Sequence, residues 1–289
     1  MKWIDFENPT SVDDAVKLLS SSNGEAKLLA GGTDLIVQMR AGALAPSLVV
    51  DVKSIPELNE LSLNDNGLTI GAAVPCYKIY NDPGVVAHFP GLIDSSSIIG
   101  GTQIQGRASL GGNLCNAAPS GDSIPAMIAY GGVANITGPN GGRQVSLEDF
   151  CTGPRRTVLS SDEILISISF PSPEKGSGAH YMRFIPRNEM DIAVVGVGTS
   201  VVLDGDNIKS ARVTLASVAP TPIYIESIGD AIAGKPADES TIADAGQMAK
   251  EAAKPITDMR GTIEYRKHLC DVLTRRSLAK SIERAKENN

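Results

Sequence analysis

The chain has 289 residues, 42% of them hydrophobic, and a formal net charge of −7, so it can bury a sizeable core, and its length favours more than one domain. An acidic chain is a poor partner for nucleic acid, and no apolar run approaches the roughly 18 residues that a membrane-spanning helix needs. The N-terminus shows no signal-peptide core and the four cysteines form no Cys-x-x-Cys pair, which predicts a cytoplasmic protein without a zinc site or an iron–sulfur cluster of its own.

The first part of the chain alternates helix and strand signals. A capping box over 10–13 predicts that a helix follows it. The expected elements are a helix over 12–19, a strand over 27–30, a helix over 34–40, a strand over 48–52 and a short helix over 55–61. This alternation is typical of an α/β layer.

The middle of the chain mixes short helices with strands around a glycine-rich stretch over 106–125. The turn Pro139-Asn-Gly-Gly142 predicts a β-hairpin, and the alternation of apolar residues over 164–170 predicts a half-buried strand. The other expected elements are a strand over 68–74, helices over 77–81, 85–89, 92–99 and 124–130, and hairpin strands over 134–137 and 143–147.

A segment rich in Pro, Gly and Ser over 171–178 predicts the domain boundary. We therefore expect a first domain over 1–174, with subdomains over about 1–55 and 56–174, and a second domain over 175–289. The second domain should be a small α+β unit with a three-stranded antiparallel sheet. Its expected strands cover 181–185, 192–203 and 208–218, and its expected helices cover 223–233, 242–253 and 263–286. The last helix is basic, which suits either a solvated face or a docking surface.

Two glycine pairs carry the strongest functional signal. Gly31-Gly32 lies between an expected strand and helix, and Gly111-Gly112 lies in the glycine-rich stretch, with Asp122 behind it. Small residues let the backbone approach a ligand closely, and free N–H groups can then point at an anion. Neither segment matches a GxGxxG fingerprint or a P-loop. We expect both glycine pairs to form loops. A tight turn explains one such loop, but two together indicate two clamps on a bulky ligand that carries phosphate.

Three segments resemble the flavin-binding motifs of one family. Leu28-Leu-Ala-Gly-Gly-Thr-Asp-Leu35 resembles the first motif of the FAD subunits of molybdenum hydroxylases, and Ser109-Leu-Gly-Gly-Asn113, with Asn116 and Ser120-Gly-Asp122, resembles the second. Arg183-Phe-Ile-Pro-Arg187, followed by Met190-Asp-Ile-Ala193, resembles a third signature. The family includes the FAD subunit of xanthine dehydrogenase and the medium subunit of aerobic carbon monoxide dehydrogenase, and the resemblance covers essentially the whole chain.

The resemblance implies a fold and a role. The fold is α+β: a two-part FAD-binding domain of the vanillyl-alcohol-oxidase or PCMH type, followed by a small domain with a three-stranded antiparallel sheet and helices. The role is electron transfer from a molybdopterin-binding large subunit, through [2Fe–2S] clusters on a small subunit, to FAD and then to an external acceptor such as NAD or a quinone. The assembly implied is a dimer of heterotrimers. Because none of the histidines lies beside a glycine pair, the FAD should be bound non-covalently.

The same resemblance assigns residues to the cofactor. The two glycine segments would hold the FAD pyrophosphate through Lys27, Leu28, Leu29, Ala30, Gly31, Gly32, Thr33, Asp34, Ser109, Leu110, Gly111, Gly112 and Asn113. Asp122 matches a FAD-contacting Asp, although it also suits the N-cap of the next helix, and both roles can hold together.

Other matched positions surround the adenine and the ring. Ile164 or Leu165 matches an apolar contact on the adenine side, although core packing alone explains both. Arg183 matches a cation that stabilises the reduced flavin, with a surface ion pair as the alternative. Ile192 matches the residue that covers one face of the isoalloxazine. Ile99 stands where some relatives carry Phe, which leaves the ring environment and an NAD site open.

The sequence offers no catalytic set of its own. We find no Ser-His-Asp triad or paired carboxylates in a motif context, and we predict no catalytic residue and no metal ligand. This suits a flavin relay, in which the cofactor carries the chemistry. Two alternatives remain open at this point: a stand-alone FAD-dependent oxidoreductase with its own substrate, and a flavin-binding module without catalysis.

Overall fold

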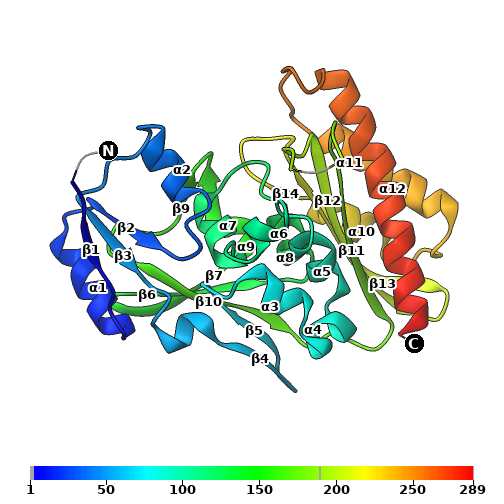
Figure 1. Cartoon of the computed structure of the whole chain (residues 1–289). Coiled ribbons are helices and arrows are strands. Elements are labelled where there is room, and N and C mark those ends of the chain that lie inside the picture. The colour runs from blue at the N-terminus through cyan, green and yellow to red at the C-terminus, as the bar shows by residue number, and fades with distance from the viewer. Residues whose placement is uncertain (1–2, 189, 289) are drawn as a thin grey trace.

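The computed structural model describes residues 3–188 and 190–288. The buried apolar residues form three separate hydrophobic cores, one in each of three parts of the molecule. Figure 1 shows the three parts side by side, from the N-terminal sheet through a central sheet with its layer of helices to the C-terminal sheet and its long last helix.

The N-terminal part is a three-stranded parallel sheet in the order β1-β3-β2. Its elements are β1 (Asp5–Glu7), α1 (Val12–Ser21), β2 (Ala26–Leu29), α2 (Leu35–Arg40) and β3 (Leu48–Asp51). Ser11 caps α1 by accepting a hydrogen bond from the Asp14 amide, and the face of α1 that carries Ala15, Val16 and Leu19 is buried. The expected alternation of helix and strand is present. The edge strand β1 was not predicted; its three residues are all exposed.

The central part is a five-stranded antiparallel sheet in the order β4-β5-β10-β6-β7. Its strands are β4 (Leu61–Asn64), β5 (Gly67–Gly71), β6 (Val133–Gly138), β7 (Gly141–Ser146) and β10 (Ile164–Pro171). The last strand in sequence, β10, therefore pairs between β5 and β6 in the middle of the sheet. The 3₁₀ helix η1 (Pro56–Asn59) precedes β4, and a small hairpin of β8 (Cys151–Gly153) and β9 (Arg156–Thr157) precedes β10.

A run of short helices connects β5 to β6 and packs in the same core. These helices are α3 (Cys76–Tyr80), α4 (Pro83–His88), α5 (Pro90–Ser96), α6 (Thr102–Gln105), α7 (Leu110–Asn116) and α8 (Ser123–Ala129), and α9 (Leu147–Phe150) follows β7. The sequence did not predict β4, α6 or α7, and the glycine-rich stretch that we expected to be a loop contains all of α7.

The C-terminal part is an antiparallel sheet in the order β11-β12-β13-β14 with three helices in its core. Its elements are β11 (Ser177–Phe184), β12 (Val195–Asp204), β13 (Asn207–Ala216), β14 (Ile223–Tyr224), α10 (Glu226–Ile232), α11 (Glu239–Ala252) and α12 (Ile263–Glu287). The three expected strands are present, and the two-residue β14 adds a fourth. The helix that we expected from 223 begins at Glu226, because 223 and 224 pair with β13 instead.

The strand expected from Ile192 begins only at Val195. Residues before it form a loop in which Met190 has a left-handed φ of 53° and Asp191 pairs with Arg187 and Arg260. Ile192, the next residue of this loop, is half exposed.

The C-terminal part is fastened to the central part through α5 and α8. A Cβ atom on Gly198 of β12 would lie 2.4 Å from the Pro125 carbonyl oxygen of α8, so only glycine permits this approach. Arg284 of α12 donates to both carboxylate oxygens of Asp94 on α5, at 2.5 and 2.9 Å. The connection between β10 and β11 spans 172–176. The domain boundary at 174/175 stays a prediction.

Candidate cofactor site

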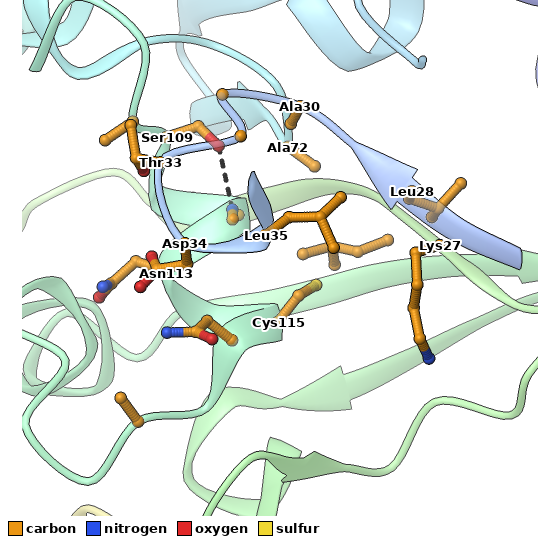
Figure 2. A pocket seen from close by; sticks show the side chains of 18 of the residues that line it. Lys27, Leu28, Ala30, Thr33, Asp34, Leu35, Ala72, Ser109, Asn113 and Cys115 are labelled. Atoms are coloured by element: carbon orange, nitrogen blue, oxygen red, sulfur yellow. Dashed lines mark hydrogen bonds between the residues drawn. The ribbon is translucent and has the colours of Figure 1, made fainter. Parts of the chain in front are cut away.

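A cleft of about 840 Å³ lies where the N-terminal sheet meets the helices of the central part. Asp191 and Ile192 of the C-terminal part also line it. Its volume falls in the range of cofactor pockets, which is roughly 300–1,000 Å³. Figure 2 shows a close view of side chains from the first two parts around this space.

One wall is the turn that links β2 to α2. Gly32 adopts a φ of +79°, and a Cβ atom on Gly31 would lie only 2.0 Å from the carbonyl oxygen of Arg107. The glycine pair therefore permits both a left-handed turn and direct backbone contact with the second motif. Within the described chain, the backbone N–H groups of 31–34 donate no hydrogen bond to protein. They are available to an anion at the start of α2.

The opposite wall is the start of α7, which corrects the expectation of a second loop. Ser109 is its N-cap, and the Ser109 Oγ accepts a hydrogen bond from the Gly112 amide at 3.0 Å, as the dashed line in Figure 2 shows. A Cβ atom on Gly111 would lie 2.5 Å from the Ala72 carbonyl oxygen, whereas one on Gly112 would meet only the Ser109 Oγ, at 2.9 Å. Both glycines line the cleft, but only Gly111 also packs closely against the backbone of another segment.

The two walls are joined directly. The Arg107 Nε donates to the Gly31 carbonyl oxygen at 3.2 Å, and the Gln38 Nε2 of α2 donates to the Asn116 Oδ1 of α7 at 3.0 Å. Segments about 80 positions apart in sequence therefore form one site.

Known families cover both halves of the chain. Residues 2–173 match the family described as the FAD binding domain in molybdopterin dehydrogenase, and residues 180–281 match the CO dehydrogenase flavoprotein C-terminal domain. The chain belongs to the FAD-binding subunits of the molybdopterin dehydrogenases. This family membership confirms the resemblance, the fold class and FAD as the cofactor.

Relatives are similar over nearly their full length. A putative xanthine dehydrogenase FAD-binding subunit from Escherichia coli (strain K12) is 31% identical over 97% of this chain and 96% of its own. A carbon monoxide dehydrogenase medium chain from Afipia carboxidovorans is 30% identical over 98% of both chains. Among solved structures, a reconstituted CO dehydrogenase from Oligotropha carboxidovorans has a TM-score of 0.94 at 29% identity, covering 98% of this chain and 99% of the matched chain.

The chemistry of the cleft fits FAD. A pyrophosphate is an anion, and the free backbone N–H groups of 31–34 can donate hydrogen bonds to it. Gly31 and Gly32 have no side chain that could block its approach. Gly112 leaves comparable room on the opposite wall. Arg155 adds a cation, since it lines the cleft and interacts with Asp34.

The cleft collects nearly all residues that the sequence assigned to FAD. Its lining includes Lys27, Leu28, Ala30, Gly31, Gly32, Thr33, Asp34, Ile99, Ser109, Gly111, Gly112, Asn113, Asp122, Ile164, Leu165 and Ile192. Leu29, Leu110 and Arg183 do not line it. Leu110 is fully buried in the central core, so its motif position serves packing.

Asp122 sits at the start of α8 without capping it. Its carboxylate makes no hydrogen bond to the helix amides and pairs instead with Tyr181 and Arg183 of β11. Burial raises the pKa of the Asp122 carboxyl, and the Arg183 guanidinium opposes that rise. Arg183 is therefore a buried partner of Asp122 behind the cleft wall, not a surface ion pair.

Sequence reasoning missed several lining residues. Arg155 follows Pro154 in the β8–β9 turn with a left-handed φ of 57°, and a turn of this kind gives no motif to read. Gln38 was not predicted, because a single side-chain amide on a helix does not indicate a binding site. Partial burial raises the pKa of the Asp34 carboxyl above its ordinary value, and the positive charge of Arg155 opposes that rise.

The described residues offer neither a metal-binding cluster nor a membrane-spanning helix. No group of three or more His, Cys, Asp or Glu side chains in 3–188 and 190–288 could hold a metal ion. None of the helices in these ranges has both the length and the apolar composition required to cross a bilayer.

Proposed function

We infer that this chain is the FAD-carrying electron-transfer subunit of a multi-subunit molybdenum hydroxylase. A molybdopterin-binding large subunit passes electrons to the [2Fe–2S] clusters of a small subunit. This chain takes the electrons from those clusters and delivers them to an external acceptor such as NAD or a quinone. Bound FAD supplies the redox chemistry, because flavins exchange either one or two electrons.

The observation that carries the proposal is the convergence of two glycine motifs on one cleft. Their backbones are in contact at Gly31 and Arg107, so the free N–H groups of 31–34 and the small residues of both motifs surround one space that suits an anion. Gly31, Gly32 and Thr33 would hold the pyrophosphate from one side, and Ser109 and Gly112 from the other.

The remaining assigned residues would shape the ends of the cofactor. Ile164 and Leu165 of β10 give an apolar floor for the adenine side. Ile99 and Ile192 face the other end, where Ile192 is half exposed and able to cover a ring. No histidine among the described residues lines the cleft, which supports non-covalent binding of the FAD.

The identities of the relatives support these partners. They include FAD-binding subunits and medium chains of xanthine and carbon monoxide dehydrogenases. A solved relative is described as a carbon monoxide dehydrogenase that lacks the Mo-pyranopterin moiety of its molybdenum cofactor. A dimer of heterotrimers is the assembly we propose. All four cysteines are free, which supports the predicted cytoplasmic location.

Co-purification tests the proposal. The tagged chain should be isolated yellow, acid precipitation should release FAD into the supernatant, and the accompanying proteins should contain molybdenum and iron. The isolated chain should accept electrons from a chemical reductant yet oxidise no purine, aldehyde or heterocycle. Turnover of such a substrate by the single chain would instead support a stand-alone oxidoreductase, and FAD binding without partners or reduction would support a non-catalytic module.

A further inference from the structure

Two side chains of β11 hold Asp122 from behind the cleft wall. The Tyr181 hydroxyl donates to Asp122 Oδ1 at 2.9 Å, and Arg183 Nη1 donates to Asp122 Oδ2 at 2.5 Å. The Arg183 Nη2 also donates to the Ile98 carbonyl oxygen at 2.9 Å. Asp122 lines the cleft, but Tyr181 and Arg183 do not.

The group is enclosed by protein. Tyr181 is 2% exposed, and the side chains of Arg183 and Asp122 are 7% and 12% exposed. The neighbouring strand makes room for the tyrosine hydroxyl, because a Cβ atom on Gly196 of β12 would lie 2.7 Å from it. Tyr181 and Arg183 are two residues apart on one strand, so both point to the same face.

We propose that Tyr181 and Arg183 are positioning residues that keep Asp122 ionised and correctly oriented for FAD, and so make cofactor binding depend on the C-terminal domain. The inference rests on the function proposed above. An ionised carboxylate has about four acceptor directions. Tyr181 and Arg183 occupy two of them, which leaves the others for hydroxyl or N–H groups of the cofactor.

The charge balance explains why two donors are needed. Burial favours the neutral acid and raises the pKa of Asp122, while Arg183 and Tyr181 favour the carboxylate. The ionisable groups nearby on other elements packed against α8 have other partners: Asp94 of α5 pairs with Arg284 and with His180 of β11, and Arg212 of β13 pairs with Glu148 of α9 and stacks on Tyr224 of β14. Arg183 is thus the countercharge of Asp122. Without it, the carboxyl takes up a proton as the pH falls through its raised pKa, and the acceptor is lost.

The test measures the dissociation constant of FAD on the full chain, purified with its accompanying subunits and freed of flavin, at about pH 8 and about pH 5. Wild-type affinity should change little between the two values. Arg183→Met should weaken binding about tenfold at the higher pH, and about tenfold more at the lower. Arg183→Lys should restore the flat pH profile, and Tyr181→Phe should weaken binding about threefold to tenfold.

The control is a second ion pair between the same two domains, that of Arg284 with Asp94. Arg284→Met removes the arginine partner of Asp94, which lies outside the cleft, and leaves the Tyr181 amide to donate to Asp94 at 3.2 Å. This variant should lower stability without changing FAD affinity at either pH. Wild-type affinity and a flat profile for both Arg183→Met and Tyr181→Phe would overturn the inference, as would losses equal to those of Arg284→Met. If Arg183→Met does not fold, Tyr181→Phe and Arg183→Lys decide the matter by the same comparison. A wild-type chain that binds no FAD would overturn the proposed function instead.

Discussion

The two glycine pairs that border the cleft look alike in sequence and are built differently. Gly31-Gly32 forms a turn after a parallel strand, whereas Gly111-Gly112 lies in the first turn of a helix. In each pair the first glycine is required by the protein itself: Gly31 lies against the Arg107 carbonyl and Gly111 against the Ala72 carbonyl.

The second glycines differ. Gly32 needs its left-handed φ of +79°, and a Cβ atom there would also crowd Leu29 and Ile36. Gly112 has an ordinary helical backbone, and a Cβ atom would meet only the Ser109 Oγ. Of the four glycines, Gly112 is the one that the fold needs least. The comparison therefore separates glycines that build the site from one that leaves room for the ligand.

The largest effect should come from Gly31→Ala. Its Cβ would lie 2.0 Å from a backbone oxygen that cannot rotate away, so the two motifs must separate. We expect the free energy of unfolding in urea to fall by about 3 kcal/mol, with FAD binding lost as well. Gly106→Ala is the control, because this exposed residue has room for a Cβ. Equal stability of the two variants would show that the turn is not packed as described.

Gly112→Val should instead separate binding from folding. The added side chain would enter the space for the pyrophosphate, so we expect FAD affinity to fall at least about 100-fold, or about 2.7 kcal/mol. The free energy of unfolding should change by less than about 1 kcal/mol, since only the Ser109 Oγ must move. Calorimetric titration with FAD and circular dichroism check the two halves. Wild-type affinity would mean that Gly112 does not face the cofactor.

Ser109→Ala should have a smaller effect on both quantities. Loss of the hydrogen bond to the Gly112 amide should cost about 1 kcal/mol of stability and loosen the start of α7, with a severalfold rise in the FAD dissociation constant. Ser11→Ala is a matched control, because Ser11 caps α1 in the same way outside the cleft. The two variants should lose similar thermal stability, and only Ser109→Ala should bind FAD more weakly. Identical FAD affinity for both would limit Ser109 to capping.

The sequence predicted most elements whose apolar residues follow a regular period. The helix over 263–286 and the strand over 164–170 have such patterns, and both occur within a residue or two of the expected ends. Helix α7 escaped prediction because two glycines lower helix propensity and resemble a loop. Its signal was present in Ser109 as a cap and in Leu110 and Leu114, which are spaced for one buried face.

The sequence predicted only part of the site. The residues of each motif are contiguous in sequence, whereas the residues that they contact lie far away along the chain. The glycine pairs could be read from the sequence, but nothing local shows that Gly31 touches Arg107 or that Arg183 lies against Asp122. These contacts join positions that are 76 and 61 residues apart in sequence, so only the packing of the whole chain brings them together. The same reasoning explains why Tyr181 carried no signal.

The smallest effect should come from the hydrogen bond between Gln38 and Asn116, which joins the two walls at 3.0 Å. Gln38→Met keeps the length of the side chain and removes the donor. One neutral, half-exposed bond contributes about 1 kcal/mol or less, and the Arg107–Gly31 contact still holds the walls together. We expect FAD affinity to fall about threefold, with almost unchanged stability. Because Asn116→Ala removes the same bond, the double variant should bind FAD about as well as either single variant. Fully additive losses would show that the two residues act on the cofactor separately.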